Sequence, residues 1–134
     1  SESTTRRIEA VGDKLVDYLL FVDEFPLEEP VRGTSEFAAQ FEARGPFDSR
    51  GRSLRQLDLK RRLMKYPCRY LIYSEAFDEL PIAVKDYTYQ RLFDILAGKV
   101  EDDETRLTDE DRTAILEIVR ETKNNLPDYW HVAK

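Results

Sequence analysis

Cysteine and histidine are almost missing from this sequence. Cys68 is the only cysteine and His131 is the only histidine among 134 residues. A single cysteine excludes an internal disulfide and any site built from several thiolates. A single histidine excludes a two-histidine metal site within one chain. We therefore predict no metal site and no cofactor.

Long apolar runs and an excess of positive charge are also missing. No stretch approaches the roughly 18 apolar residues that a membrane-spanning helix needs, so we expect no membrane span. The chain has 27 acidic and 21 basic residues, which gives a net charge of −6. This charge disfavours non-specific binding to nucleic acid, because such binding depends on neutralising phosphates. We therefore expect no nucleic-acid partner.

The composition is nevertheless typical of a folded domain. Hydrophobic residues make up 41% of the sequence and aromatic residues 11%, which is enough to form a core, although 36% of the residues are charged. The length fits one domain. We predict a disordered or linker N-terminus at residues 1–7, a single helical domain at 8–130 and a tail at 131–134.

Apolar residues recur at helical spacing along most of the chain. In residues 8–24 they lie three or four positions apart, which predicts an amphipathic helix. Further helices are expected over 35–44, 53–66, 67–73, 81–98 and 108–123, with a short one after Ser74. The expected N-caps are Thr34 or Ser35, Ser53, Ser74 and Thr108, the last forming a capping box with Asp111.

These segments predict an all-α fold, a compact bundle of about five to seven helices packed orthogonally rather than as a coiled coil. Residues 69–73 also suit a short strand, but an isolated strand would have nothing to pair with. Trp130 is expected to dock the C-terminal segment on the body of the domain, since a large indole is seldom left in water.

The most apolar part of the chain contains the one catalytic candidate, Cys68. Pro67 is well placed to begin a helix, and a helix N-terminus and the neighbouring Arg69 would both lower the pKa of the thiol. The thiol would then be a nucleophile or redox sensor. The alternative is a small buried side chain packed among tyrosines.

Tyrosines and arginines around this stretch are the binding candidates. Tyr66, Tyr70 and Tyr73 recur at helical spacing and can line an aromatic pocket, although such a stripe also suits a core. Seven basic residues lie between 50 and 65 with one acid, Asp58, and can hold an anion or an acidic partner, or simply face solvent. The candidate binding residues are Arg50, Arg52, Arg55, Arg61, Arg62, Arg69, Tyr70 and Tyr73.

The run from Tyr66 to Pro81 resembles one near the C-terminus of a group of bacterial proteins that have no established activity and are often predicted to be exported. Residues 31–34, 43–46, 51–54, 121–123 and 126–127 carry the same resemblance, which spans residues 11–130. It implies a domain of a longer exported protein, located in the periplasm. No functional residue carries over from it.

Two functions remain open at this point. The leading hypothesis is a protein-interaction or scaffolding module, with the basic residues 50–65 and the acidic residues 101–111 available for head-to-tail contacts between copies. Its partner is another protein or a second copy. The alternative is a catalytic or anion-binding domain with a tyrosine-lined pocket near Cys68.

Overall fold

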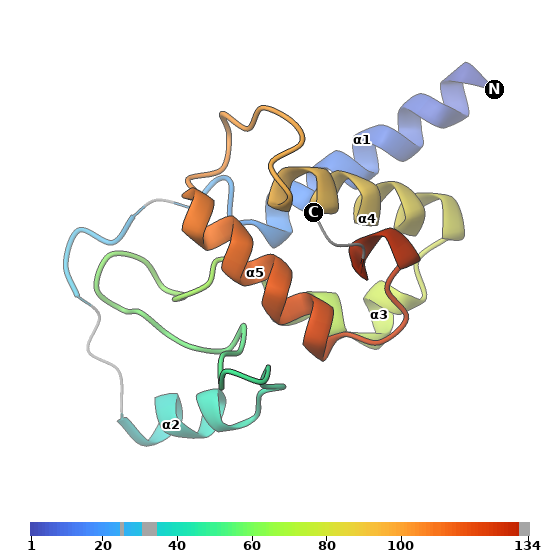
Figure 1. The fold of residues 1–134 in the computed structure, drawn as a ribbon. Helices are drawn as coiled ribbons and strands as arrows, with labels where there is room; N and C mark the ends of the chain where they lie inside the picture. Colours follow the sequence, from blue (N-terminus) through green and yellow to red (C-terminus); the bar gives the residue numbers. More distant parts are fainter. Residues whose placement is uncertain (25, 31–34, 132–134) are drawn as a thin grey trace.

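Helices and irregular segments make up the part of the chain that the structure describes, residues 1–24, 26–30 and 35–131 of a computed structural model (Figure 1). The α-helices in this part are α1 (Glu2–Leu19), α2 (Ser35–Ala43), α3 (Glu75–Asp78), α4 (Ile82–Leu96) and α5 (Asp109–Thr122). Two 3-10 helices accompany them, η1 (Tyr70–Tyr73) and η2 (Asp128–His131). No strand occurs among the described residues, so the predicted all-α fold is confirmed.

Two of the predicted caps, Ser74 and Thr108, are confirmed, whereas the Ser53 cap is wrong because no helix follows that residue. Ser74 begins α3 and accepts a hydrogen bond from the Phe77 amide. Thr108 begins α5 and forms the predicted capping box with Asp111, in which each side chain accepts from the other residue's amide. The Thr34 cap and residues 132–134 of the tail predicted at 131–134 lie outside the described residues, and His131 is the last residue of η2.

The first helix begins earlier than predicted. Ser1 caps it by accepting from the Thr4 amide at 3.2 Å, and Glu2 adds a negative charge in the first turn. Residues 2–7 are therefore helical rather than a linker, and that prediction was wrong. The helix also ends at Leu19 instead of residue 24, because Phe21 adopts a left-handed conformation with a φ of 59°.

The helix predicted over residues 53–66 does not form. Its amides bond locally instead: Asp58 donates to the Leu63 carbonyl and Leu59 to the Arg62 carbonyl, both at 2.9 Å. Residues 57–64 thereby form a hairpin closed by one bridge between Leu57 and Met64, which we call the 57–64 hairpin. Leu57 and Leu59 alternate with polar residues, which is a strand-like pattern. The sequence analysis missed it because Leu57 and Leu59 also lie three or four positions from Leu54 and Leu63, as in a helix.

The helix predicted to begin at Pro67 was also wrong. Only residues 70–73 are helical, as the single 3-10 turn η1. The Arg69 amide donates instead to the Leu19 carbonyl at the end of α1, at 2.8 Å. Arg69 itself is extended, with a ψ of 137°, so the chain is not helical where it meets α1.

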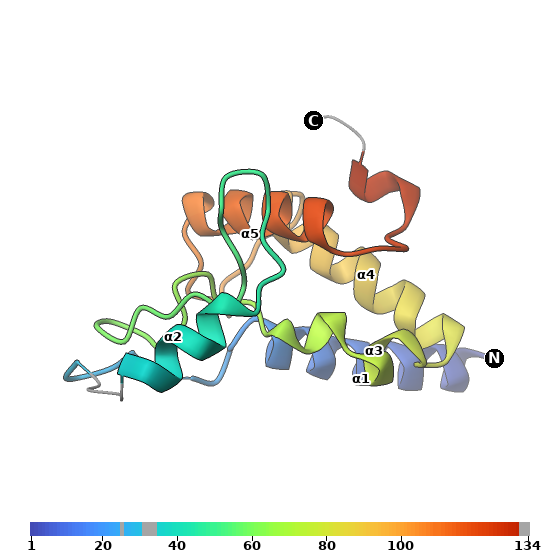
Figure 2. The same cartoon turned by 90° about the horizontal axis from the view of Figure 1, so that it is seen from below.

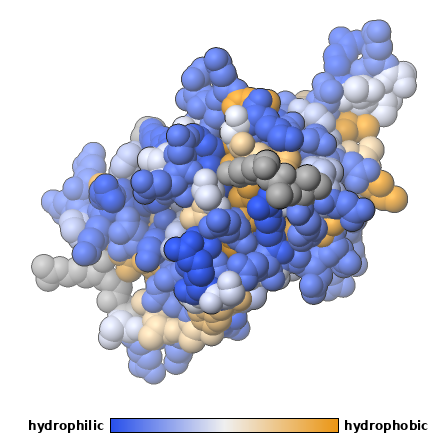
Figure 3. All heavy atoms as spheres, in the orientation of Figure 1, coloured by the Kyte–Doolittle hydropathy of each residue, from blue (hydrophilic) through white to orange (hydrophobic). Residues whose placement is uncertain are grey.

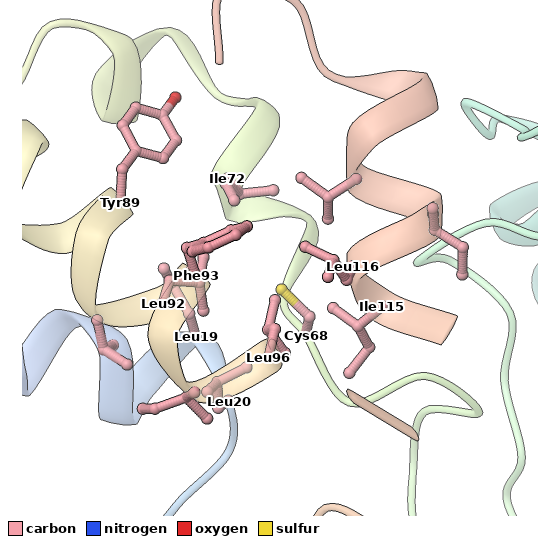
Figure 4. Close-up of a cluster of buried hydrophobic side chains, with 14 of the residues drawn as sticks. Leu19, Leu20, Cys68, Ile72, Tyr89, Leu92, Phe93, Leu96, Ile115 and Leu116 are labelled. Carbon is pink, nitrogen blue, oxygen red and sulfur yellow. The ribbon is translucent and has the colours of Figure 1, made fainter. Parts of the chain in front are cut away.

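The core lies between α1, α4, α5 and the segment of residues 68–77. Leu19, Leu92, Ile115 and Ile118 are fully buried there, and Figure 4 shows side chains from all of these elements meeting. Trp130 is completely buried too, with its ring against Tyr89 and Phe93. The predicted docking of the C-terminal aromatic segment is therefore confirmed. None of the helices in the described ranges is long and apolar enough to cross a membrane.

Helix α1 packs against α4 (Figures 1 and 2), and Gly12 of α1 lies against Tyr87 and Thr88 of α4. A Cβ atom at this position would lie 2.3 Å from Cδ2 of the Tyr87 ring. The ring cannot easily swing away, since its hydroxyl donates to Asp13 at 2.6 Å. Glycine is therefore needed where the two helices cross.

We predict that Gly12→Val lowers the free energy of unfolding by about 2 kcal/mol, because overpacking a close helix contact outweighs the small difference in helix propensity. Urea denaturation measures the effect. Ala10→Val, on the exposed side of the same helix, is the matched control. Equal stability of the two variants would contradict the assignment.

Candidate functional site

Cys68 is a core residue in this structure. Its side chain is fully buried, and Figure 4 shows its sulfur close to Leu96 and Ile115. Burial raises the pKa of the thiol to about 12, the opposite of the predicted lowering. The predicted helix N-terminus at Pro67 is missing, and the Arg69 side chain is occupied elsewhere. The hypothesis of an activated thiol was therefore wrong.

The tyrosines do not gather in one pocket. Tyr70 is 45% exposed, whereas the Tyr73 hydroxyl lies in the interior, 2.6 Å from the Thr122 hydroxyl. Tyr66 lines a different hollow beside the basic residues. The three side chains do not share one face because residues 66–69 form a bent, irregular segment rather than a helix, with the Cys68 amide turned back to the Tyr66 carbonyl.

Three of the seven basic side chains form ion pairs within the chain. Arg62 donates to both carboxylate oxygens of Asp111, at 3.0 and 2.9 Å. Arg52 bonds the buried Asp48 at 2.7 Å and Glu117 at 3.1 Å, and the exposed Arg50 lies 3.7 Å from Glu117. Arg62 and Asp111 are thus not free for the predicted head-to-tail contact between copies.

Four of the seven basic side chains, Arg55, Lys60, Arg61 and Lys65, form no ion pair with any described residue. Lys60 and Arg61 are exposed at the tip of the 57–64 hairpin, and neither has an ion pair among the described residues. They border a hollow of about 920 Å³ that also contains Asp109, Glu110 and Asp111. Because acids line the same hollow, it does not favour an anion.

An apolar hollow of about 510 Å³ lies between α2 and the 57–64 hairpin; we call it the aromatic groove. The α2 wall consists of Phe37, Ala38 and Phe41, and the hairpin wall of Leu57, Leu59, Leu63 and Met64. Tyr18, Phe21, Arg69, Tyr70, Leu71 and Ser74 complete the lining. Figure 3 shows apolar surface gathered over α2 on the same side of the molecule.

Arg69 shapes one end of this groove. Its guanidinium lies over the rings of Tyr18 and Phe21, at 4.1 and 4.0 Å from their centroids. Its Nε donates to the Tyr18 carbonyl and its Nη2 to Glu24, both at 2.9 Å. The side chain thus satisfies the end of α1 and fixes two aromatic rings at the same time.

Arg55 contacts two rings of the groove without lining it. Its guanidinium lies 4.9 Å from the centroid of Phe41 and 4.4 Å from that of Tyr70, and its Nε donates to the Gly45 carbonyl at 2.8 Å. Phe41 and Tyr70 also meet edge to face at 5.7 Å. These contacts hold α2 against the domain, although α2 has no buried residue of its own.

Neither a family model, nor a curated protein, nor a solved structure matches this chain. The bacterial, exported origin implied by the resemblance of residues 11–130 therefore stays a prediction. Function has to be argued from the geometry. Among the described residues, no group of histidine, cysteine, aspartate or glutamate side chains is arranged to hold a metal ion.

The sequence analysis singled out Tyr70 and Arg69 of the groove, and Arg55 beside it, but none of the other groove residues. Phe37 and Leu63, two of the residues that it did not single out, are 67% and 48% exposed. Composition offered one signal: α2 holds two phenylalanines and three alanines in nine residues, more apolar surface than so short a helix can bury.

We predict that Cys68 reacts with iodoacetamide at least about 100-fold more slowly in the native chain than in urea, since the reaction needs an exposed thiolate. Mass spectrometry measures the extent of alkylation. The urea-unfolded protein is the control, because it presents the same thiol without burial. Comparable rates in the two states would restore the activated-thiol hypothesis.

We predict that Arg62→Gln lowers the free energy of unfolding by about 1–2 kcal/mol near neutral pH, because Asp111 loses two charge-assisted hydrogen bonds. Arg61→Gln is the matched control and should change it by less than about 0.5 kcal/mol. Urea denaturation of both variants measures the difference, and a larger effect at Arg61 would contradict it.

The same pair gives a pH dependence. Burial raises the pKa of Asp111, but hydrogen bonds from Arg62 and Thr108 outweigh burial and lower it below its ordinary value. A lowered pKa in the folded state stabilises the fold above the unfolded pKa of about 3.9, and this stabilisation is lost as the pH falls through the folded value. The difference between wild type and Arg62→Gln should therefore shrink below about pH 4.

Proposed function

We propose that this chain is a helical protein-interaction module that binds its partner through the aromatic groove. The observation that carries the proposal is the group of exposed apolar side chains at this one place. Phe37 is 67% exposed, Leu63 48% and Tyr70 45%, and all three line the groove. Grouped apolar side chains on a protein surface are typical of interaction sites, whereas single ones are ordinary.

The residue types support the same function. Aromatic residues and arginine are enriched at the centres of protein interfaces, where they contribute most of the binding energy. Here Arg55 and Arg69 each stack on two aromatic rings of the groove. Rings that are held in place lose little freedom on binding, so the groove is organised before a partner arrives.

A second candidate is a small apolar molecule in the same groove. A volume of about 510 Å³ lies within the range of ordinary ligand sites. The polar groups at the groove favour a small-molecule ligand less than a protein partner. The Nε and Nη2 atoms of Arg69 already donate to the Tyr18 carbonyl and to Glu24. Native mass spectrometry distinguishes the two: extra mass that disappears on denaturation indicates a bound small molecule.

We predict that a photo-cross-linking amino acid at position 37 captures a discrete protein partner when the chain is produced in its native cells. The same amino acid at position 82 is the matched control, since Ile82 is 73% exposed but does not line the groove. Adding Tyr70→Asp should abolish cross-linking from position 37, because a charge in the groove opposes apolar docking. Equal cross-linking from both positions, or none from position 37, would refute the proposal.

A further inference from the structure

The 57–64 hairpin, green in Figure 1, lies between α2 and α5. It separates the aromatic groove from the hollow of about 920 Å³, which we call the charged hollow. Its residues on the groove side are Leu57, Leu59, Leu63 and Met64. Its residues in the charged hollow are Asp58, Lys60, Arg61 and Arg62, and Leu57 borders both spaces. The place of the hairpin between the two helices therefore sets the width of the groove.

The hairpin contributes nothing to the hydrophobic core. None of residues 57–64, all of which the structure describes, belongs to the cluster of buried side chains between α1, α4 and α5. Two hydrogen bonds tie the hairpin to its periphery: the Leu57 amide donates to the Glu42 side chain of α2 at 2.9 Å, and the Leu27 amide donates to the Arg61 carbonyl at 2.7 Å. Neither α2, which has no buried residue, nor residue 27 is part of the core.

Arg62 joins the hairpin to a core helix. Its guanidinium donates to both carboxylate oxygens of Asp111 in α5, at 3.0 and 2.9 Å, and also to the Met64 and Lys65 carbonyls, at 3.0 and 2.7 Å. Asp111 is itself held by its capping box with Thr108. A planar guanidinium that makes four hydrogen bonds in fixed directions leaves its partners little freedom to move. One side chain thus clamps the second arm of the hairpin, which carries Met64 of the groove wall, to α5.

We propose that Arg62 is a positioning residue for the aromatic groove: it clamps the 57–64 hairpin to α5 and thereby sets the distance between the hairpin wall and α2, although it does not line the groove. This inference rests on the proposed function and adds the residue that controls the shape of its binding site. Such supporting contacts matter because a binding surface loses complementarity when a wall is displaced by about 1 Å. Without the clamp, the hairpin moves while the core stays folded.

The test is the distance between two nitroxide labels, measured by pulsed electron paramagnetic resonance on the purified full chain. The labels are attached at Ala39→Cys on α2 and Lys60→Cys on the hairpin, both exposed positions, in a Cys68→Ala background. The chain with Arg62 should give one narrow distance distribution, and Arg62→Gln should broaden it at least about twofold because the hairpin is released.

Arg61→Gln is the matched control. It removes the same charge from the neighbouring residue, whose side chain has no ion pair with any described residue, and should leave the distribution unchanged. Arg62→Lys should give an intermediate width, since lysine keeps the charge but cannot make the bidentate pair. Circular dichroism establishes that each variant is folded. A folded Arg62→Gln variant with an unchanged distribution, or equal broadening by Arg61→Gln, would overturn the inference. If Arg62→Gln is unfolded, Arg62→Lys decides, and an unchanged width in that variant overturns the inference.

This distance is measured without a partner, so it separates the inference from the proposed function. If both hold, Arg62→Gln also lowers cross-linking from position 37 at least about tenfold, whereas Arg61→Gln does not. A broadened distribution together with no cross-link from position 37 in the wild type would refute the proposed function and leave the role of Arg62 standing. Normal cross-linking together with an unchanged distribution in Arg62→Gln would refute the inference alone.

Discussion

The end of α1 depends on Arg69, and much of the structure depends on where α1 ends. Phe21 occupies the left-handed position after the helix, where glycine is usual and another residue costs about 1–2 kcal/mol. The Phe21 and Val22 amides return to the Tyr18 and Asp17 carbonyls, which completes the turn. Arg69 offsets the strain by stacking on the Phe21 ring and bonding the Tyr18 carbonyl. One side chain thus stops the helix, anchors the central segment and forms the end of the groove.

Charged side chains also anchor the irregular residues 44–66 to the rest of the domain. This segment buries few large apolar groups, and ion pairs attach it to α5 instead. Buried Asp48 accepts hydrogen bonds from the Arg50 and Arg52 amides and from the Nε atom of Arg52. The Nη2 atom of Arg52 in turn donates to Glu117 of α5. Burial raises the pKa of Asp48, but these hydrogen bonds lower it overall. The high charged content of the sequence is therefore partly structural, which composition alone did not reveal.

The sequence predicted elements whose determinants are local and failed where the determinants are distant. Thr108 and Asp111 cap α5 within a single turn, so the start of this helix could be predicted from the local sequence. Arg69 binds a helix end about fifty residues earlier in the chain, and no local pattern reports that. Cys68 illustrates the same limit, because its neighbours suggested activation while its three-dimensional surroundings bury it. The groove was only partly predictable, since Tyr70 and the arginines were candidates but the hairpin leucines were read as a helix.

The weak attachment of α2 makes its surface largely independent of the folding core. Its nine residues lie outside the core formed by α1, α4 and α5, and they are fixed chiefly by Arg55, by the ring of Tyr70 and by Glu42, which accepts from the Leu57 amide. Substitutions on the outer face of α2 can therefore change this surface while the core remains intact. Under the proposed function, lineages of this chain can acquire new binding preferences at this helix without first acquiring extra stability, a freedom that surfaces built from core helices do not have.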